Sequence, residues 1–244
     1  MLAVIIQARM GASRLPGKVL MKIGKKTVLQ WVVERIKMVP SVDGIIVATS
    51  DKKQDDLIEK FCKKNNIECF RGSEDDVLSR YFEASKVCGA DIILRITADC
   101  PFVDPVIIEE IIKIHLKNKN DCTMNNTGSS YPRGSDVELF NFKSLEIAYL
   151  KAKKKYQREH VSPYIYEHPN LFKVEILEAK GMLNRPTYRF CLDTKEDLAE
   201  IRKIYSLLSK EKKEINTINI IKLLDAHPEV VKINAEVKQK KVGE

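Results

Sequence analysis

Residues 1–18 read MLAVIIQARMGASRLPGK, and this stretch decides the fold. Its first half, Leu2–Ala8, is an apolar, β-branched run of the length of one buried strand. Its second half is a glycine-containing turn that carries the cationic residues Arg9, Arg14 and Lys18. A buried strand that leads directly into such a turn is typical of the first strand of an open α/β sheet. No basic segment precedes the apolar run, so we do not expect a signal peptide.

Strands and helices continue to alternate through the first half of the chain. Further strands are predicted at Gly44–Ala48, Ile67–Arg71 and Asp91–Thr97. Between the strands, apolar residues recur at the three- and four-residue spacing of one buried helix face. They are Val28, Leu29, Val32, Val33 and Ile36, then Leu57, Ile58 and Phe61, then Val77, Tyr81, Ala84 and Val87. Another helix is predicted after Asp104-Pro105, a capping residue followed by a first-turn proline. The pattern predicts an α/β fold with a mostly parallel sheet flanked by helices.

The alternation changes after about Asn118. Beyond it we expect irregular strands and loops over Asp121–Phe142, helices over Lys143–Lys154 and Gln157–Glu167, extended chain over Phe172–Glu178, a strand over Tyr188–Leu192, and helices from Glu196 and Thr217. No long linker interrupts the chain. We therefore predict a single domain over 1–244, in which residues 119–180 form an inserted α+β segment for acceptor binding and dimerisation.

The composition excludes several classes of protein. No apolar run approaches the roughly 20 residues that a bilayer-spanning helix needs, so we expect no membrane partner and a cytoplasmic location. The six cysteines contain no C-x-x-C pair and the four histidines are scattered, which predicts reduced thiols and no zinc site. The net charge of +8 lies largely in lysine-rich stretches that are typical of solvated helix faces. Such a charge suits a polyanionic substrate.

The turn over residues 9–18 has the properties of a phosphate-binding loop. Ligands of open α/β sheets bind beyond the carboxyl ends of the strands, where this turn lies. Glycines let backbone N–H groups approach phosphate oxygens, and three cations stabilise charge on those oxygens during transfer. A P-loop is excluded because five residues, not four, separate Gly11 from Gly17, and Val19 replaces the Ser/Thr. The three cations would repel one another without an anion, which predicts an anionic ligand.

Two aspartates follow predicted strands and could hold a metal ion. Asp99 comes after the strand over Asp91–Thr97, and Asp193 ends the strand over Tyr188–Leu192. Carboxylates from separate strand ends can share Mg²⁺, which prefers hard oxygen ligands. The structural alternative for Asp99 is a turn before proline. For Asp193 it is the neighbouring capping box that starts at Thr194, which leaves Asp193 itself free.

Several motifs resemble one enzyme family. The stretch over residues 6–18 (IQARMGASRLPGK) resembles the signature of cytidylyltransferases related to 3-deoxy-manno-octulosonate cytidylyltransferase and CMP-sialic acid synthetase, and it resembles most the branch named for spore-coat polysaccharide biosynthesis. The later motifs of that branch follow in order: 70–78 (FRGSEDDVL), 95–101 (RITADCP), 131–134 (YPRG), 158–161 (REHV) and 192–194 (LDT). The similarity spans nearly the whole chain.

The resemblance implies a Rossmann-like (GT-A-type) nucleotide-diphospho-sugar transferase fold and a homodimer. It also implies a Mg²⁺-dependent reaction in which CTP activates an acidic sugar, or a similar small anionic acceptor, for surface polysaccharide synthesis and pyrophosphate leaves. Asp99 and Asp193 match the metal-binding aspartates of the family. Arg71 and Ser73 match its base-reading segment, so the preference for CTP over another NTP rests on the resemblance alone.

The predicted site residues fall into three groups. The catalytic residues are Arg9, Arg14, Lys18 and Asp99. The predicted nucleotide-binding residues are Gln7, Ala8, Met10, Gly11, Ala12, Ser13, Arg71, Ser73, Arg95 and Thr97. The predicted acceptor-binding residues are Arg133, Asp136, Glu138, Arg158, Glu159 and His160. An arginine can bind an acceptor carboxylate bidentately, His160 is a candidate general base, and the alternative for this third group is an internal ion-pair network or a dimer contact.

Two other functions remain open at this point. A glycosyltransferase of the same architecture would usually present D-x-D at the metal, where this chain has Asp99-Cys100-Pro101. A non-catalytic nucleic-acid-binding module would explain the positive charge, but no aromatic-interleaved basic patch accompanies the lysines. We therefore expect no nucleic-acid partner.

Overall fold

The computed structural model describes residues 1–126 and 130–239. Four parallel strands form one half of a seven-stranded sheet, in the order β5-β4-β1-β6. They are β1 (Leu2–Gln7), β4 (Gly44–Ser50), β5 (Glu68–Gly72) and β6 (Ile92–Thr97). All four lie where the apolar runs predict strands, which confirms the α/β fold. The carboxyl ends of these strands meet at one edge of the sheet.

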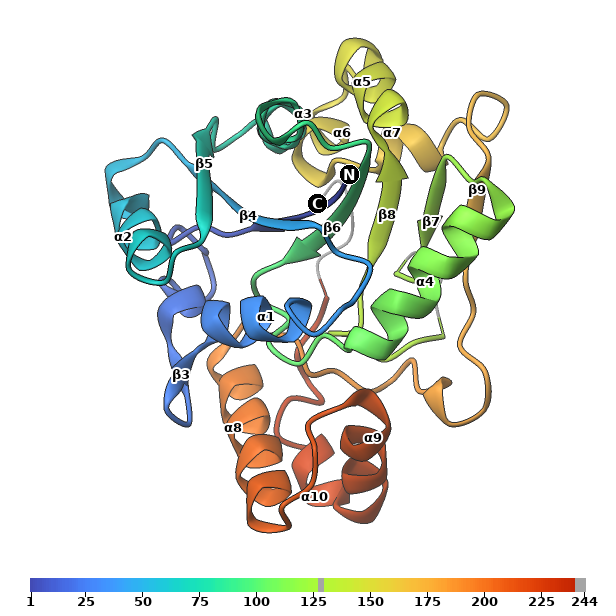
Figure 1. The fold of residues 1–244 in the computed structure, drawn as a ribbon. Coiled ribbons are helices and arrows are strands. Elements are labelled where there is room, and N and C mark those ends of the chain that lie inside the picture. The colour runs from blue at the N-terminus through green and yellow to red at the C-terminus, as the bar shows by residue number, and fades with distance from the viewer. Residues whose placement is uncertain (127–129, 240–244) are drawn as a thin grey trace.

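The other half of the sheet comes from the middle of the chain (Figure 1). Strands β8 (Glu138–Asn141), β7 (Cys122–Met124) and β9 (Val174–Ile176) continue the sheet beyond β6 in that order. Strand β8 is antiparallel to both of its neighbours. Segment 119–180 therefore completes the sheet as well as contributing helices above it.

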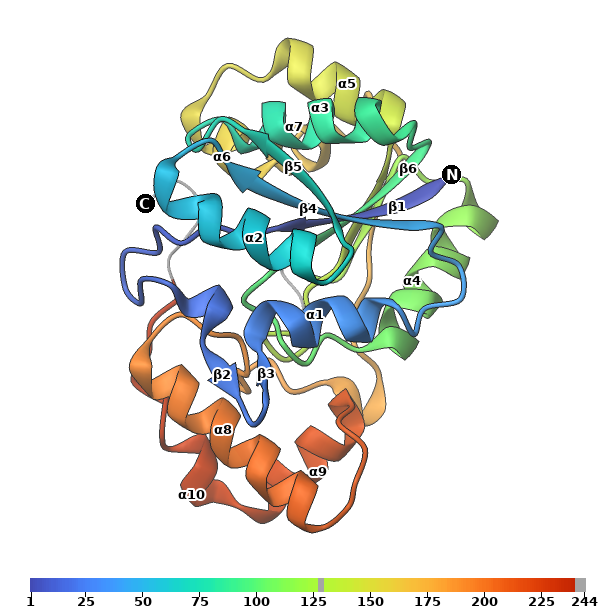
Figure 2. The same ribbon diagram turned by 60° about the vertical axis from the view of Figure 1, so that its left-hand side comes forward.

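Helices cover both faces of the sheet (Figures 1 and 2). One face packs on α1 (Val28–Ile36), α2 (Asp56–Lys64) and α4 (Pro105–Asn118). The other packs on α3 (Val77–Cys88) and α5 (Phe142–Lys151), with the short helices α6 (Lys155–His160) and α7 (Pro163–Tyr166) beside them. Strand β1 shows why both faces are covered, since Val4 and Ile6 belong to one apolar cluster and Ala3 and Ile5 to the other.

A further helical layer packs outside α1 (Figure 2). It contains α8 (Lys195–Lys210), α9 (Thr217–Ala226) and α10 (Pro228–Val231), and the small hairpin of β2 (Lys22–Ile23) and β3 (Lys26–Thr27) contacts it. The capping box predicted at Thr194 is present, with Asp197 as its reciprocal partner. Asp104 caps α4 as predicted and also accepts a 2.7 Å hydrogen bond from the backbone N–H of Thr217, so one carboxylate joins this layer to the main domain.

The predicted strand over Tyr188–Leu192 is wrong as a sheet strand. The segment is extended, but among the described residues its backbone pairs with loops and not with a strand. The contacts are an isolated bridge between Arg133 and Arg189 and a 2.8 Å hydrogen bond from the N–H of Leu192 to the carbonyl of Asp99. Its apolar residues Phe190 and Leu192 are buried against the outer helical layer instead of within the sheet. The burial of a short apolar run does not by itself distinguish these two environments.

The predicted helix over Gln157–Glu167 is also wrong, because it is two helices. Val161 has a φ of 73°, which no helix accommodates, and Pro163 opens the second helix. The kink brings Glu159, His160 and Ser162 to the wall of the main cavity. Among residues 1–126 and 130–239, no helix is both long and apolar enough to cross a bilayer.

Candidate active site

A cavity of about 770 Å³ opens at the carboxyl ends of β1 and β6. The predicted site residues that line it are Gln7, Arg9, Ala12, Ser13, Arg14, Lys18, Arg95, Thr97, Asp99, Arg133, Asp136, Glu138, Glu159, His160 and Asp193. Side chains that the sequence did not single out complete the wall: Val77, Asn126, Ser162, Tyr166, Cys191 and Gln239 among them. The cavity thus joins the 9–18 turn to the middle segment.

The 9–18 turn is held in shape by the protein itself. The N–H of Gly17 donates a 2.9 Å hydrogen bond to the carbonyl of Met10, which closes the loop, and Gly17 has a φ of 73° that favours glycine. The N–H of Met10 in turn donates to the buried carboxylate of Asp55 at 2.7 Å. The loop is therefore preorganised before any ligand binds.

Lys18 lies between the two predicted metal-binding aspartates. Its Nζ is 2.7 Å from Oδ2 of Asp99 and 2.8 Å from Oδ1 of Asp193, and it also donates to the carbonyl of Leu192 at 2.7 Å. Burial acts to lower the pKa of Lys18, but the two carboxylates outweigh it and hold that pKa above its ordinary value. Burial acts to raise the pKa of Asp99, and Lys18 overcomes this and lowers the pKa to about 2. The carboxylate of Asp99 is therefore ionised at neutral pH.

Asp193 is contacted by two arginines as well. Nη2 of Arg14 lies 2.9 Å and Nη2 of Arg189 lies 2.6 Å from Oδ2 of Asp193. Arg189 is fixed by a 2.9 Å ion pair with the fully buried Asp197, whose carboxylate also accepts the N–H of Asp193. Carboxylates of the protein itself thus balance Arg14 and Lys18. Mutual repulsion among the cations of the turn therefore does not by itself require an anionic ligand.

The two aspartates fit a hard divalent cation. Each aspartate places a carboxylate oxygen within 2.8 Å of Nζ of Lys18, so the two oxygens flank a single cation position. In residues 1–126 and 130–239 no group of three or more His, Cys, Asp or Glu side chains forms a metal site. A Mg²⁺ ion here would complete its shell with waters and ligand oxygens, as this ion commonly does.

Arg95 forms the floor of the cavity beside the turn. Its Nη1 is 2.5 Å from Oε1 of Glu138, and its Nη2 donates to Oε1 of Gln7 at 3.2 Å. Burial acts to lower the pKa of Arg95, but the Glu138 carboxylate more than offsets it, so the pKa lies above its ordinary value. This pair joins a predicted nucleotide-binding residue on β6 to a predicted acceptor-binding residue on β8.

The acceptor side of the cavity combines a cation, two carboxylates and an imidazole. Arg133 is only loosely paired with Asp136, at 3.7 Å. Burial raises the pKa of Asp136, although Arg133 partly opposes this. Burial also lowers the pKa of His160 against the opposing effect of Glu159, so its ring is neutral near pH 7 and able to accept a proton.

Gly134 shapes this side of the cavity. It has a φ of 105°, and a β-carbon there would lie 2.7 Å from Cδ2 of Phe190 and 2.9 Å from the Phe190 backbone. The N–H of Gly134 donates to Asp136 at 3.2 Å. The close approach of residue 134 to residue 190 explains the glycine in the 131–134 motif, because any side chain would push the two loops apart.

Six predicted residues lie outside the cavity wall, and three of them, Arg71, Ser73 and Arg158, contact other parts of the protein. Arg71 is paired with Asp56 and Glu59 at 2.8 Å each, because the edge strand β5 directs it toward α2. Ser73 accepts the N–H of Asp76 at 3.0 Å, and Arg158 binds Asp76 in an ion pair. For Arg158, the structure therefore shows the internal ion pair that stood as the alternative to acceptor binding.

Backbone positions Ala8, Met10 and Gly11 also do not line the cavity, although they hold the turn that does. A base-reading role for Arg71 or Ser73 stays a prediction.

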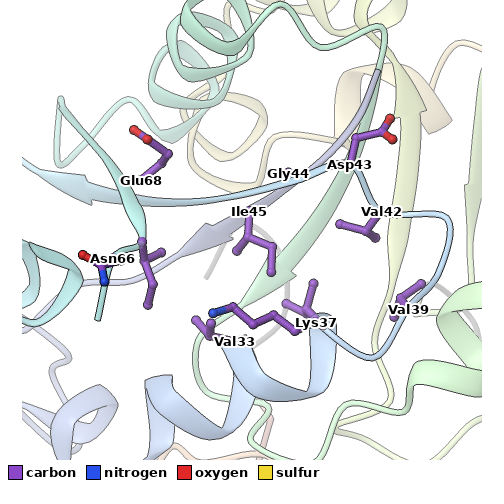
Figure 3. A pocket seen from close by; sticks show the side chains of 11 residues that line it. Val33, Lys37, Val39, Val42, Asp43, Gly44, Ile45, Asn66 and Glu68 are labelled. Atoms are coloured by element: carbon purple, nitrogen blue, oxygen red, sulfur yellow. The ribbon is translucent and has the colours of Figure 1, made fainter. Parts of the chain in front are cut away.

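A second hollow lies at the opposite end of the sheet (Figure 3). It measures about 310 Å³ and is bounded by the end of α1 and the first residues of β4 and β5. Aliphatic side chains such as Val33 and Ile45 form much of it, and Lys37, Asp43 and Glu68 are dispersed around it (Figure 3). It lacks the converging charges of the larger cavity, which is therefore the candidate active site.

Comparisons with known proteins point to one family. The model of the cytidylyltransferase family matches residues 3–222. An uncharacterised protein of Methanocaldococcus jannaschii is 42% identical over 243 residues, covering 98% of this chain and 97% of that protein. The spore coat polysaccharide biosynthesis protein SpsF of Bacillus subtilis is 36% identical over 230 residues, covering 92% and 94%. The structure of a cytidylyltransferase from Leptospira borgpetersenii superposes with a TM-score of 0.87 at 32% identity, covering 98% of this chain and 99% of that one. The family model includes every residue of the cavity wall except Gln239.

Proposed function

Because this chain belongs to the cytidylyltransferase family, we propose that it transfers CMP from CTP to a small acidic sugar and releases pyrophosphate. The observation that carries the proposal is the convergence of Lys18, Asp99 and Asp193 at one point beside a preorganised cationic turn. Membership of this family agrees with the resemblance in the sequence. It leaves the glycosyltransferase and nucleic-acid-binding alternatives without an observation that favours them.

The 9–18 turn is proposed to bind the triphosphate. Ala12 and Ser13 line the cavity. Within the part of the chain that the structure describes, Arg9 has a single ion-pair contact, at 3.9 Å with Glu74, so it is available for phosphate oxygens. Arg14 stands at the same wall, next to Asp193. Nucleotidyl transfer depends on positioning and on charge stabilisation at phosphate oxygens, and these groups supply both.

Asp99 and Asp193 are proposed to hold Mg²⁺. When bound, the ion would supply Lewis-acid stabilisation of the α-phosphate and would lower the pKa of the acceptor hydroxyl. Lys18 holds the two carboxylates close together through its contacts with both, and it favours the ionised form of Asp99. The neutral ring of His160 provides a group that could take the hydroxyl proton.

The acceptor is proposed to be an anion that lies against Arg133. This side chain is 42% exposed and only weakly paired, so its guanidinium can bind a carboxylate bidentately. The families that the sequence resembles are named for sugar acids, and SpsF is named for polysaccharide biosynthesis. Both agree with an acidic sugar that becomes part of a surface glycan.

Incubation with each of the four NTPs, Mg²⁺ and a panel of sugar acids, with pyrophosphate as the readout, tests the proposal. We expect release with CTP and one class of acceptor. Asp99→Asn and Asp193→Asn should each abolish it while circular dichroism stays unchanged, whereas Glu146→Gln, an exposed carboxylate on α5, should be silent. Full activity in both aspartate variants, or no NTP binding at all, would refute the assignment.

The middle segment is further proposed to carry a homodimer contact. Ile147 and Leu150 project from α5 and are 40% and 68% exposed, one turn apart on the same helix. Light scattering of the wild type and of Leu150→Glu tests this contact. A monomeric wild type would contradict it.

A further inference from the structure

The segment over residues 232–239 leaves the outer helical layer and returns to the active site, rising toward the sheet in Figure 1. It lies beyond the region that the family model matches, which ends at residue 222. Gln239 nevertheless lines the main cavity. The segment therefore contributes to the site a wall that the family motifs do not include.

Asn234 fixes the course of this segment. The residue is 5% exposed, and its Nδ2 lies within hydrogen-bond distance of the carbonyl of Arg189 at 3.1 Å, of Oδ1 of Asp197 at 3.0 Å and of Oε2 of Glu200 at 2.6 Å. The N–H of Val237 then donates to the carbonyl of Asn234 at 2.9 Å, which turns the chain toward the cavity. The residues that follow are thus delivered to a defined place.

Two acceptors at the end of this segment hold two arginines of the site. The carbonyl of Lys238 accepts from Nη1 of Arg14 at 3.0 Å, and Oε1 of Gln239 accepts from Nη1 of Arg189 at 2.6 Å. Each arginine uses its other terminal nitrogen to bind the same oxygen, Oδ2 of Asp193. The segment thus binds one terminal nitrogen of each guanidinium group, while the other terminal nitrogen of each binds the carboxylate of Asp193.

We propose that residues 238 and 239 are positioning residues for nucleotide binding, acting through Arg14 and Arg189. This inference rests on the proposed function, in which the cavity binds a nucleoside triphosphate. The chemistry of Gln239 supports it, because an amide oxygen restrains Arg189 without adding negative charge to a cavity that takes a polyanion. A carboxylate at the same place would restrain the arginine and also repel the triphosphate.

Two shortened chains separate the contribution of residues 238–241 from that of the last three residues. A chain ending at Val237 removes both acceptors but keeps Asn234, and a chain ending at Lys241 keeps the acceptors. We expect the Kd and KM for CTP to rise about fivefold or more in the first, as loss of charge-assisted hydrogen bonds implies, with kcat nearly unchanged. The second should behave as the wild type.

Point variants test the charge argument without shortening the chain. Gln239→Glu should raise the Kd for CTP more than Gln239→Ala, while both melt as the wild type does. If the chain ending at Val237 does not fold, the Gln239→Glu variant decides alone. Wild-type Kd and KM for CTP in Gln239→Glu would overturn the inference. Failure of the wild type itself to bind CTP would instead refute the proposed function.

Discussion

Replacing Lys18 with methionine is expected to destabilise the protein at neutral pH and to do so less in acid. Methionine keeps most of the length and apolar stem of lysine but removes the charge that Asp99 and Asp193 share. The side chains of these aspartates are 26% and 17% exposed, so solvent screens them only in part. Breaking a buried ion pair on one side leaves an uncompensated charge, which is where most of the cost arises.

The pKa of Asp99 gives the size of the effect. It is lowered from the ordinary 3.8 to about 2. At about 1.4 kcal/mol per pH unit, the shift corresponds to roughly 2–3 kcal/mol of unfolding free energy. A carboxyl group with a lowered pKa contributes this stability above the unfolded pKa and loses it as the pH falls toward the folded value. The contribution of Lys18 should therefore be full at pH 7 and roughly half as large at pH 3.

Urea unfolding followed by circular dichroism measures the effect at the two pH values. The wild type, Lys18→Met and the exposed-lysine control Lys60→Met should be compared in the same buffers. Added Mg²⁺ should raise the midpoint of Lys18→Met more than that of the wild type, since a cation that binds the folded state alone stabilises it. An unchanged midpoint at pH 7, or an equal loss at both pH values, would refute the electrostatic reasoning.

Two further substitutions test the surroundings of the site. Gly134→Ala should lower the free energy of unfolding in urea by about 2–4 kcal/mol, because a φ of 105° and a contact of 2.7 Å with Phe190 combine strain with a clash. The control Gly89→Ala, at a positive φ but in open space, should lower it clearly less, and equal losses would contradict the clash. Glu200→Gln should flatten the dependence of melting temperature on pH. Burial raises the pKa of Glu200 to about 8, so the wild type loses stability as the pH rises from about 4.5 to 8. The same slope in the variant as in the wild type would show that another group titrates.

Local periodicity predicted the parallel half of the sheet and its helices. In β1, alternate residues face two apolar clusters, and such a strand reads as one continuous apolar run whatever surrounds it. The same signal failed over Tyr188–Leu192, because a short run buried against α8 and α9 has the same apolar character as a run buried in a sheet. It failed over Gln157–Glu167 because a positive φ at Val161 breaks the helix. Pro163, two residues later, is the sequence signal of such a break, since proline is disfavoured inside a helix.

Some residues of the candidate site could be predicted from the sequence, and others could not. The proximity of Asp99 to the 9–18 turn follows from parallel strands that end at one edge. Asp193 reaches the same place although its segment is not a strand, since a backbone hydrogen bond ties Leu192 to Asp99. Arg189 and Gln239 carried no signal in the sequence, because which carboxylate or amide meets which arginine is decided by contacts between distant segments.

Charge balance links the metal and the nucleotide in this site. Arg14, Lys18 and Arg189 face Asp99 and Asp193 within one network of contacts below 3 Å. A divalent ion that binds alone must compete with Lys18 for both carboxylates, and a triphosphate that binds alone must draw Arg14 away from Asp193. When the two bind together, each compensates the charge that the other displaces, since the anion takes the freed cations and the metal takes the freed carboxylates. We therefore expect the nucleotide and the metal to bind with positive coupling, each raising the affinity for the other by the same factor.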